Sequence, residues 1–242
     1  GCATTCGTDA KTYRRGHHLM VPPTTFGHEF SGEIVEVGSE VEKFKPGIRV
    51  VPHNSAPCQT CYYCKHGQEN LCGSILWNFG AYAEYICMPE EGKGFKKGLI
   101  TNKPSNLSFE EAAAVPGGGI TALTVLRKAY LQPGKKVLIW GASGSVGTYA
   151  VQLAKYWGAE VTGVCGPGNI QLVRSLGADT VIDYTVTDIT AGGDTYDVIF
   201  DAVDKLAAAQ GKKCLKKRGT YLRVGRDSGD GKDLQTQDLD FL

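Results

Sequence analysis

Four cysteines lie within fifteen consecutive positions of the sequence, spaced CxxCxxCx7C. This spacing allows one loop to fold around an ion and enclose it in four thiolates. A site with four protein ligands is structural, because no coordination position is left for water or a substrate. Soft sulfur ligands in a reducing compartment favour zinc, and an iron-sulfur cluster, which uses the same ligands, is the alternative. The predicted zinc ligands are Cys58, Cys61, Cys64 and Cys72.

A glycine-rich turn, GASGSVG at residues 141–147, joins an apolar segment to an amphipathic one. Glycines let the backbone turn sharply and approach a pyrophosphate, which the amide groups and positive end of a following helix then hold. Such turns also serve packing alone, but a turn between strand and helix in an alternating pattern favours a dinucleotide site. The predicted cofactor-binding residues are Gly141, Ser143, Gly144, Ser145, Val146 and Gly147.

The end of the next predicted strand bears on which dinucleotide is bound. An NAD site usually carries Asp or Glu about 20 residues after the turn, where it bonds the ribose hydroxyls. Here that strand ends in Val164 and Cys165, and Glu160 lies at its opposite end, so no carboxylate repels a 2′-phosphate. Arg174 is a candidate contact for that phosphate, although a solvated helix face explains it equally well. The sequence therefore predicts NADP, with NAD as the alternative.

Two further polar clusters, CGTD at residues 6–9 and GHE at residues 27–29, contain the components of a catalytic zinc site. Taken singly, a cysteine is more often a small core residue and a histidine a packed one. Together, Cys6, His28 and Glu29 offer a thiolate, an imidazole and a carboxylate to zinc, which would polarise an alkoxide or carbonyl while a hydride moves to or from nicotinamide. We predict Cys6, His28 and Thr8 as catalytic residues. Thr8 would relay the substrate proton, and Asp9 would orient His28.

The residues of the glycine turn need a layered scaffold. From about residue 108, apolar segments alternate with helical patterns, which is typical of a parallel sheet with helices on its faces. The most regular helical pattern spans residues 145–157, and Gly158 ends it. The predicted strands are residues 137–140, 160–164, 181–183, 197–201 and 220–224.

The first third of the chain contains short strands broken by glycine and proline. Residues 33–37 end at Gly38, Pro46 and Gly47 form a turn, and residues 49–51 resume an extended segment. This pattern predicts a small barrel. The predicted domains are therefore residues 1–107, a catalytic domain with the cysteine lobe, residues 108–225, a dinucleotide-binding domain, and residues 226–242, a polar tail.

The overall composition excludes several classes of protein. Lys and Arg number 26 against 25 Asp and Glu, a net charge of +1 that offers no electrostatic footprint for nucleic acid. No apolar run approaches the roughly 18 residues of a membrane span. The other five cysteines are scattered, unlike those of a cross-linked secreted scaffold. The first residues lack a secretory signal, so we expect a cytoplasmic protein.

The clusters at residues 6–9 and 27–29, the cysteine lobe and residues 32–51 resemble the zinc-dependent alcohol and polyol dehydrogenases of the medium-chain dehydrogenase/reductase superfamily. The resemblance implies an α/β protein with a GroES-like β-barrel catalytic domain, which carries the structural zinc lobe, and a Rossmann domain with a doubly wound parallel sheet. It also implies that Cys6 and His28 are catalytic zinc ligands and that Glu29 is the nearby carboxylate.

From about Phe79 onward the chain is more similar to the quinone oxidoreductase branch of this superfamily, through residues 80–85, 110–123 and 141–147. That branch usually lacks zinc and reduces quinones or enones with NADPH. In the polyol branch a carboxylate supplies a third zinc ligand, and the matching residues 114–117 contain none, since Pro116 cannot bind metal. A catalytic zinc would therefore need Glu29 as a ligand. Without zinc, Tyr13 is a candidate proton donor.

Three hypotheses follow from these features. The first is an NADP(H)-dependent, zinc-binding oxidoreductase that interconverts an alcohol and an aldehyde or ketone. The second is a zinc-independent NADPH quinone or enone reductase, and the third is a non-catalytic nucleotide-binding fragment. The expected partner is a small-molecule alcohol, carbonyl or quinone, with neither nucleic acid nor membrane. Relatives start earlier and continue beyond residues 220–224, so the strand through which they usually dimerise lies outside this chain and a homo-oligomer stays an open expectation.

Overall fold

The computed structural model describes residues 1–16, 20–21, 23–90, 99–193, 195–203, 206 and 208–224, without the side chains of residues 70, 208 and 209. The chain divides into two compact units, Gly1–Gly117 and Gly118–Leu242. The division lies after the residue 107 at which the sequence places a domain boundary, and that boundary stays a prediction. The predicted polar tail, residues 226–242, lies outside the described residues.

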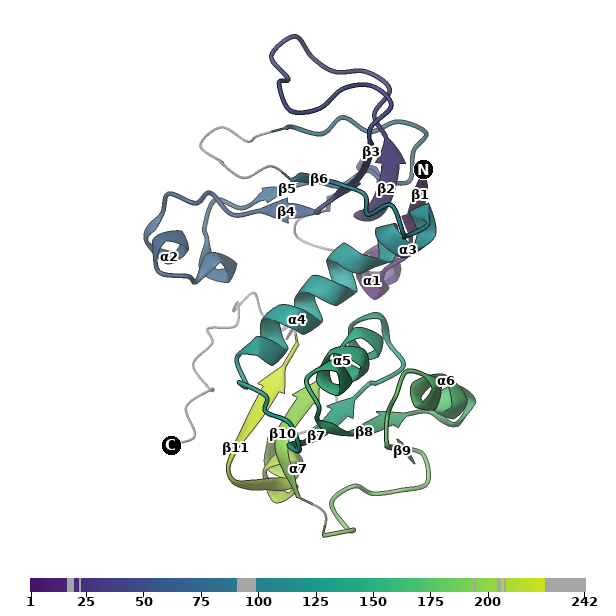
Figure 1. The fold of residues 1–242 in the computed structure, drawn as a ribbon, viewed down its shortest axis with the longest axis vertical. Coiled ribbons are helices and arrows are strands. Elements are labelled where there is room, and N and C mark those ends of the chain that lie inside the picture. The colour runs from purple at the N-terminus through teal and green to yellow at the C-terminus, as the bar shows by residue number, and fades with distance from the viewer. Residues whose placement is uncertain are drawn as a thin grey trace. The chain divides into compact units, whose positions relative to one another are not determined.

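The first unit is built on an antiparallel sheet with the strand order β1-β2-β3-β6 (Figure 1). A separate two-stranded ladder pairs β4, which precedes the cysteine lobe, with β5, which follows it. Its elements are β1 (Cys2–Thr4), α1 (Gly7–Arg15), β2 (Glu29–Glu33), β3 (Arg49–Pro52), β4 (Ser55–Ala56), α2 (Tyr62–Lys65), a 3-10 turn (Glu69–Leu71), β5 (Leu76–Trp77), β6 (Ile100–Asn102), α3 (Phe109–Ala114) and a π-helical turn (Val115–Gly119).

Strand β2 begins earlier than the sequence predicts. The expected strand at residues 33–37 overlaps β2 at Glu33 alone, and Val35 is largely exposed. The residues that do form β2 include Glu29 and Ser31, both buried. A strand normally buries apolar side chains at every second position, so buried polar residues concealed this one from the hydrophobic pattern. The expected strand at residues 49–51 is confirmed as β3.

Helix α3 is fixed at its start and rests on β2. Ser108 caps the helix: its hydroxyl accepts a hydrogen bond from the Glu111 amide (3.1 Å), and the Glu111 carboxylate accepts one from the Ser108 amide (2.8 Å). The hydroxyl of Ser31 in β2 donates to the Phe109 carbonyl at 2.6 Å. The buried Ala112 and Ala113 allow a close approach to the sheet. The segment that follows α3 is thereby held beside β2.

The second unit contains a five-stranded parallel sheet, as the alternating pattern predicts. All five expected strands and the long helix are confirmed, with ends that differ by at most one residue except at β11, which begins five residues before the expected strand. The elements are α4 (Ile120–Arg127), β7 (Lys136–Trp140), α5 (Ser145–Tyr156), β8 (Glu160–Cys165), a 3-10 turn (Pro167–Asn169), α6 (Ile170–Ser175), β9 (Thr180–Asp183), β10 (Tyr196–Asp201), α7 (Ala208–Lys213) and β11 (Leu215–Arg223).

Successive side chains of this sheet enter two apolar cores. On one face, Ile139 and Phe200 pack with Leu126 of α4, Val151 of α5 and Val173 of α6, all of them fully buried. Leu138, Val164 and Ile199 of the alternate positions pack on the other face. Because both faces are covered, the strands read as continuous apolar runs, which is why they could be recognised from sequence.

The strand order β11-β10-β7-β8-β9 makes β7 the central strand, with β8 on one side and β10 on the other (Figure 1). The chain therefore reverses its direction of progress across the sheet at β7. In doubly wound sheets the crevice outside the carboxyl ends of the strands at this point is where ligands bind. The glycine turn that follows β7 lies at that crevice. The predicted α/β fold class is confirmed.

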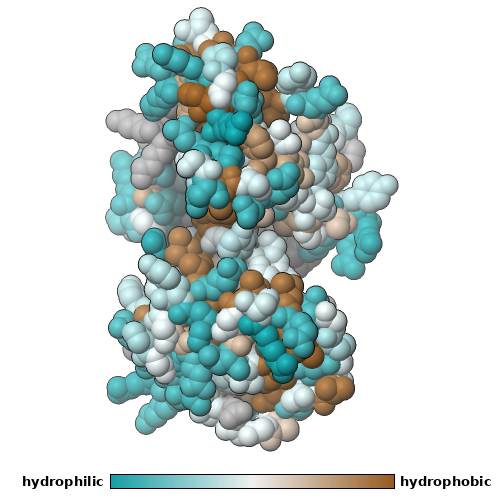
Figure 2. Space-filling view, turned by 45° about the vertical axis from the view of Figure 1, so that its right-hand side comes forward, coloured by the Kyte–Doolittle hydropathy of each residue, from teal (hydrophilic) through white to brown (hydrophobic). Residues whose placement is uncertain are grey.

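Helix length and apolar character decide whether a segment can cross a membrane. Within the described residues, no helix is both long and apolar enough to cross one. Hydrophilic and hydrophobic residues are interspersed over the face seen in Figure 2.

Asp197 ties together the amino ends of three strands of the second unit. Its carboxylate accepts hydrogen bonds from the Lys135 ammonium (3.2 Å), the Lys136 amide at the start of β7 (2.9 Å) and the Lys216 ammonium in β11 (2.8 Å). Burial by itself raises the pKa of this carboxyl, but the three donors outweigh it and lower the pKa to about 2. The ionised carboxylate of Asp197 is therefore more stable in the folded chain than in the unfolded chain.

We predict that Asp197→Asn lowers the free energy of unfolding by about 1–3 kcal/mol at neutral pH. The contribution is complete above about pH 4, where an unfolded aspartate is ionised, and is lost as the pH falls through about 2. Thermal unfolding followed by circular dichroism should show the two proteins converging as the solution is acidified. Glu160→Gln, which breaks an exposed pair with Lys136 at 3.5 Å, is the control. Equal losses for both variants at neutral pH would contradict the prediction.

Candidate metal and cofactor sites

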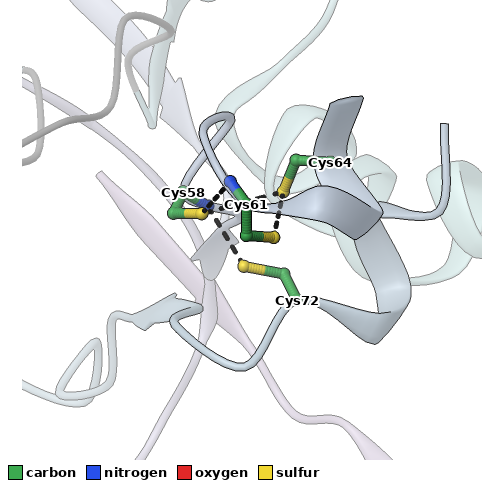
Figure 3. A group of neighbouring side chains, drawn as sticks. All are labelled: Cys58, Cys61, Cys64 and Cys72. Atoms are coloured by element: carbon green, nitrogen blue, oxygen red, sulfur yellow. Dashed lines mark hydrogen bonds between the residues drawn. The ribbon is translucent and has the colours of Figure 1, made fainter. Parts of the chain in front are cut away.

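The cysteine lobe is shaped by one short helix and two left-handed residues. Cys61 lies at the amino end of α2 and Cys64 lies within it, so one helical turn places both on the same side. Gln59 and Gly67 have positive φ angles of 59° and 71°, and they turn the chain before and after this helix. Cys72 then returns to the group (Figure 3).

The four sulfur atoms converge, as the spacing predicts. All lie within 4.8 Å of one another, with Cys61 Sγ 3.5 Å and Cys58 Sγ 3.9 Å from Cys64 Sγ (Figure 3). A tetrahedral zinc site with Zn–S bonds of about 2.3 Å separates its sulfur atoms by about 3.8 Å. The observed separations fit such a site.

Hydrogen-bond donors around the lobe suit thiolates rather than thiols. The Cys61 amide donates to Cys58 Sγ and the Cys58 amide to Cys72 Sγ, both at 3.3 Å. Hydrogen bonds from the Thr60 hydroxyl and from the amides of Thr60 and Cys61 lower the pKa of Cys58. Burial and the neighbouring sulfurs raise the pKa of Cys64. Four ionised thiolates are therefore stable here only when a cation offsets their charge, and the donor set fits zinc.

The second polar cluster is assembled from two elements of the first unit. Cys6 is the residue that begins α1, His28 precedes β2, and Glu29 is the first residue of β2. One ligand atom from each lies within 4.8 Å of the others. His28 and Glu29 are buried, while Cys6 is half-buried. The structure thus brings together the three residues that the sequence nominates as catalytic zinc ligands.

Asp9 fixes both Cys6 and His28. One carboxylate oxygen accepts a hydrogen bond from the Cys6 amide at 3.0 Å, which caps α1, and the other lies 3.1 Å from His28 Nδ1. Asp9 is buried, so its charge is well placed to hold a proton on Nδ1. That tautomer leaves Nε2 as the nitrogen able to bind a metal. The orienting role predicted for Asp9 agrees with this geometry.

Hydrogen bonds within the cluster favour an ionised thiol. Burial alone raises the pKa of Cys6, but hydrogen bonds from His28 and from the Thr8 amide and hydroxyl outweigh it and lower the pKa. For His28, burial alone lowers the pKa, whereas the bond to Cys6 and the charge of Asp9 raise it above the ordinary value. Thr8 is exposed, so its hydroxyl is open to a substrate.

Glu29 is a buried carboxylate with one unsatisfied oxygen. The Thr4 hydroxyl donates to Oε2 at 3.1 Å, and Oε1 is without a hydrogen-bond partner in the described part of the chain. Burial raises the pKa of this carboxyl, and the Thr4 bond and the His28 charge offset that rise only in part. A buried charge is costly unless it is paired or binds a metal. A buried carboxylate with an orphaned oxygen, close to a thiol and an imidazole, fits a zinc ion.

Two residues of this cluster were missed by sequence reasoning. Thr4 faces Glu29 because the two are register partners in the β1-β2 pair. The Tyr82 hydroxyl lies 3.1 Å from Asp9 Oδ2 and 3.2 Å from the Thr4 carbonyl oxygen, either of which can accept its one hydrogen bond. Its ring packs on Gly27, where φ is +91° and a Cβ would lie 2.6 Å from the ring. Strand register could have indicated Thr4, but nothing in the sequence indicates Tyr82.

The glycine turn has the close packing that a dinucleotide site requires. Gly141 has a φ of +78°, and its amide bonds the Val164 carbonyl at 3.1 Å. A Cβ on Gly147 would overlap the Gly141 carbonyl oxygen and lie 2.8 Å from Ala142 Cα, so glycine is needed there. Gly144 and Ser145 are exposed at the start of α5, where the amide groups of the first turn are available to an anion.

The carboxyl end of β8 carries no acidic side chain of its own. It ends in the buried Cys165. The neighbouring strand places Asp183 opposite Cys165, but this carboxylate accepts bonds from the Thr185 amide (2.8 Å) and hydroxyl (2.7 Å). Arg174 is exposed on α6. The expected absence of a ribose-binding carboxylate at the end of β8 agrees with this geometry.

Two family profiles match the chain. The profile of the alcohol dehydrogenase GroES-like domain matches residues 1–96, and the profile of zinc-binding dehydrogenases matches residues 145–241. The first match lies in the first structural unit and the second in the second unit.

Curated relatives come from several branches. The chain is 36% identical over 221 residues to an NAD-dependent alcohol dehydrogenase of Saccharolobus solfataricus, covering 86% of this chain and 62% of the relative. It is 31% identical to D-arabitol-phosphate dehydrogenase of Enterococcus avium, covering 97% and 68%. It is 37% identical to 2-methylene-furan-3-one reductase of Solanum lycopersicum, covering 80% and 44%. The chain thus spans about half to two thirds of the length of these relatives.

A solved structure agrees with the fold. A crystal structure of an NAD-dependent alcohol dehydrogenase superposes with a TM-score of 0.78 at 32% identity, covering 90% of this chain and 66% of that one. With the family profiles, this match confirms the predicted GroES-like and Rossmann architecture.

We predict that the lobe holds about one zinc ion per chain and that Cys61→Ser loses both this zinc and thermal stability. Elemental analysis and thermal unfolding measure the two effects. Cys87→Ser is the matched control, because Cys87 is exposed and lies outside the group. Stoichiometric iron in place of zinc, or full zinc retention by Cys61→Ser, would show the assignment to be wrong.

Proposed function

Since the chain belongs to the medium-chain dehydrogenase/reductase superfamily, we propose that it carries the catalytic parts of an NADP(H)-dependent oxidoreductase that interconverts an alcohol and an aldehyde or ketone. The observation that carries the proposal is the cluster of Cys6, His28 and Glu29, with His28 oriented by Asp9 and an orphaned oxygen on Glu29. Three ligands leave one coordination position for a substrate oxygen, which is the arrangement of a catalytic zinc.

In this reaction the carbinol carbon loses a hydride, with both electrons of its C–H bond, to the nicotinamide of NADP⁺, and the hydroxyl loses a proton. Carbonyl reduction is the reverse. Zinc held by Cys6, His28 and Glu29 would lower the pKa of the hydroxyl or polarise the carbonyl. The exposed hydroxyl of Thr8 would accept the alcohol proton while releasing its own to water.

The glycine turn supplies the other half of the proposal. The amide groups at the start of α5 would hold the pyrophosphate, with contacts from residues 141–147. The lack of a carboxylate at the end of β8 supports NADP over NAD, because an acid there would repel the 2′-phosphate. The proposed partner is a small molecule. The cytoplasm stays its predicted location.

A zinc-independent enone or quinone reductase is the second candidate. Hydride from NADPH would then add to the β-carbon of the substrate and a proton to the α-carbon. The observation that favours it is the absence of a ligating side chain in residues 114–117, together with the similarity to 2-methylene-furan-3-one reductase. A nucleotide-binding chain without turnover is the third, because residues 114–117 supply no metal ligand.

The cofactor assignment predicts that kcat/KM with NADPH exceeds that with NADH by at least about tenfold, a difference of about 1.4 kcal/mol in transition-state binding. Initial rates with the same carbonyl substrate and each cofactor measure the ratio. A strong preference for NADH would overturn the assignment. Tight NADPH binding by fluorescence, without turnover of any alcohol, carbonyl or enone, would instead favour the non-catalytic hypothesis.

The zinc assignment predicts about two zinc ions per chain and a loss of one in Cys6→Ala, with kcat/KM for an alcohol falling by at least about 100-fold. Cys2→Ala, a cysteine outside both groups, should retain both ions and full activity. One zinc in the wild type, with undiminished activity after Cys6→Ala, would favour the enone or quinone reductase.

A further inference from the structure

Gly117 faces the carboxylate of Glu29. It is part of the π-helical turn after α3, and a Cβ built on it would overlap Oε1 of Glu29 and lie 2.8 Å from Cδ and 3.2 Å from Cγ. Real Cβ atoms essentially never approach another heavy atom within 3.0 Å. The volume that any side chain at position 117 would fill is therefore taken by the Glu29 carboxylate.

We propose that Gly117 is a positioning residue for the metal cluster. Its missing side chain leaves room for the Glu29 carboxylate to lie beside Cys6 and His28 as the third zinc ligand. This inference rests on the proposed function, since it assumes that zinc binds at Cys6 and His28. It explains how the chain can form a three-ligand site although residues 114–117 supply no ligand of their own.

Hydrogen bonds and strand pairing hold both residues in these positions. Glu29 is anchored by its register pairing with Thr4 and by the Thr4 hydroxyl bond to Oε2. The turn that contains Gly117 follows α3, which the Ser31 hydroxyl ties to β2 through the Phe109 carbonyl. A methyl group at position 117 could be accommodated only by swinging the Glu29 carboxylate away and breaking its bond to Thr4.

The Glu29 oxygen that has no hydrogen-bond partner in the described residues is the one that faces Gly117. The Glu29 oxygen nearest the Gly117 side is Oε1, which is buried and has no hydrogen-bond partner within the described residues. Oε2 is already used by Thr4. The space opened by the glycine thus serves the oxygen that is free to bind a cation. Glutamate oxygen, histidine nitrogen and cysteine sulfur are all zinc ligands in proteins.

The test is Gly117→Ala, measured by zinc content, by zinc affinity in competition with a chelator, and by thermal unfolding. We expect the zinc ion at Cys6, His28 and Glu29 to bind at least about tenfold more weakly to the variant and to be lost from it. The zinc ion of the cysteine lobe should stay bound. Glu29→Gln should lose the same ion. Gly32→Ala is the matched control: Gly32 lies in β2 and a Cβ there meets nothing within 4 Å, so both ions should stay.

If Gly117 acts by leaving room for the Glu29 carboxylate, a side chain at this position should also lower the thermal stability of the chain. Gly117→Ala should lower the Tm in the wild-type chain but change it little in a Glu29→Ala chain, because the carboxylate that the methyl group would overlap is gone. Retention of the second zinc at wild-type affinity, or an equal drop of Tm in both backgrounds, would overturn the proposal. If Gly117→Ala does not fold, the double variant must fold, and its failure would also overturn it. A wild-type chain with one zinc would instead contradict the proposed function itself.

Discussion

The buried carboxylate of Glu29 sets the constraint around which the first unit is arranged. Removing a charge from water is costly unless hydrogen bonds or a cation compensate it. Thr4 supplies one hydrogen bond to Oε2, and His28 supplies a favourable charge. Oε1 is left without a partner in the described chain. The polar strand β2, the pairing of β1 with β2 and, as proposed, the bare backbone of Gly117 hold this group in its position.

Asp9 gives the same cluster its orientation. One carboxylate caps α1 through the Cys6 amide and holds the His28 ring through Nδ1, so the backbone and the two side chains are fixed by one residue. Tyr82 binds the capping oxygen from a third segment of the chain. Charged hydrogen bonds in a buried setting are among the strong ones, so the ring is well defined before any ion binds.

The second unit obeys a different constraint, which is close packing of backbone. The central position of β7 puts the glycine turn where doubly wound sheets bind ligands, and Gly147 lets the start of α5 approach the turn at Gly141. Its five strands were predictable because both faces are apolar, so the hydrophobic runs are long and unbroken. The first unit was harder to predict, since β2 buries Glu29 and Ser31 and its polar residues gave no strand pattern.

The sequence by itself determined the class of fold and indicated the chemistry to expect. Cysteine spacing indicated the lobe, and the clusters containing Cys6 and His28 indicated the second metal group, because ligand types and short spacings are written directly in the chain. Tertiary structure decided what completes that group. Thr4, Tyr82 and Gly117 are distant from His28 in sequence and meet it only through strand register and helix packing. In the proposal Gly117 acts by having no side chain. The room that this leaves for the Glu29 carboxylate can be recognised only once the neighbouring residues are in place.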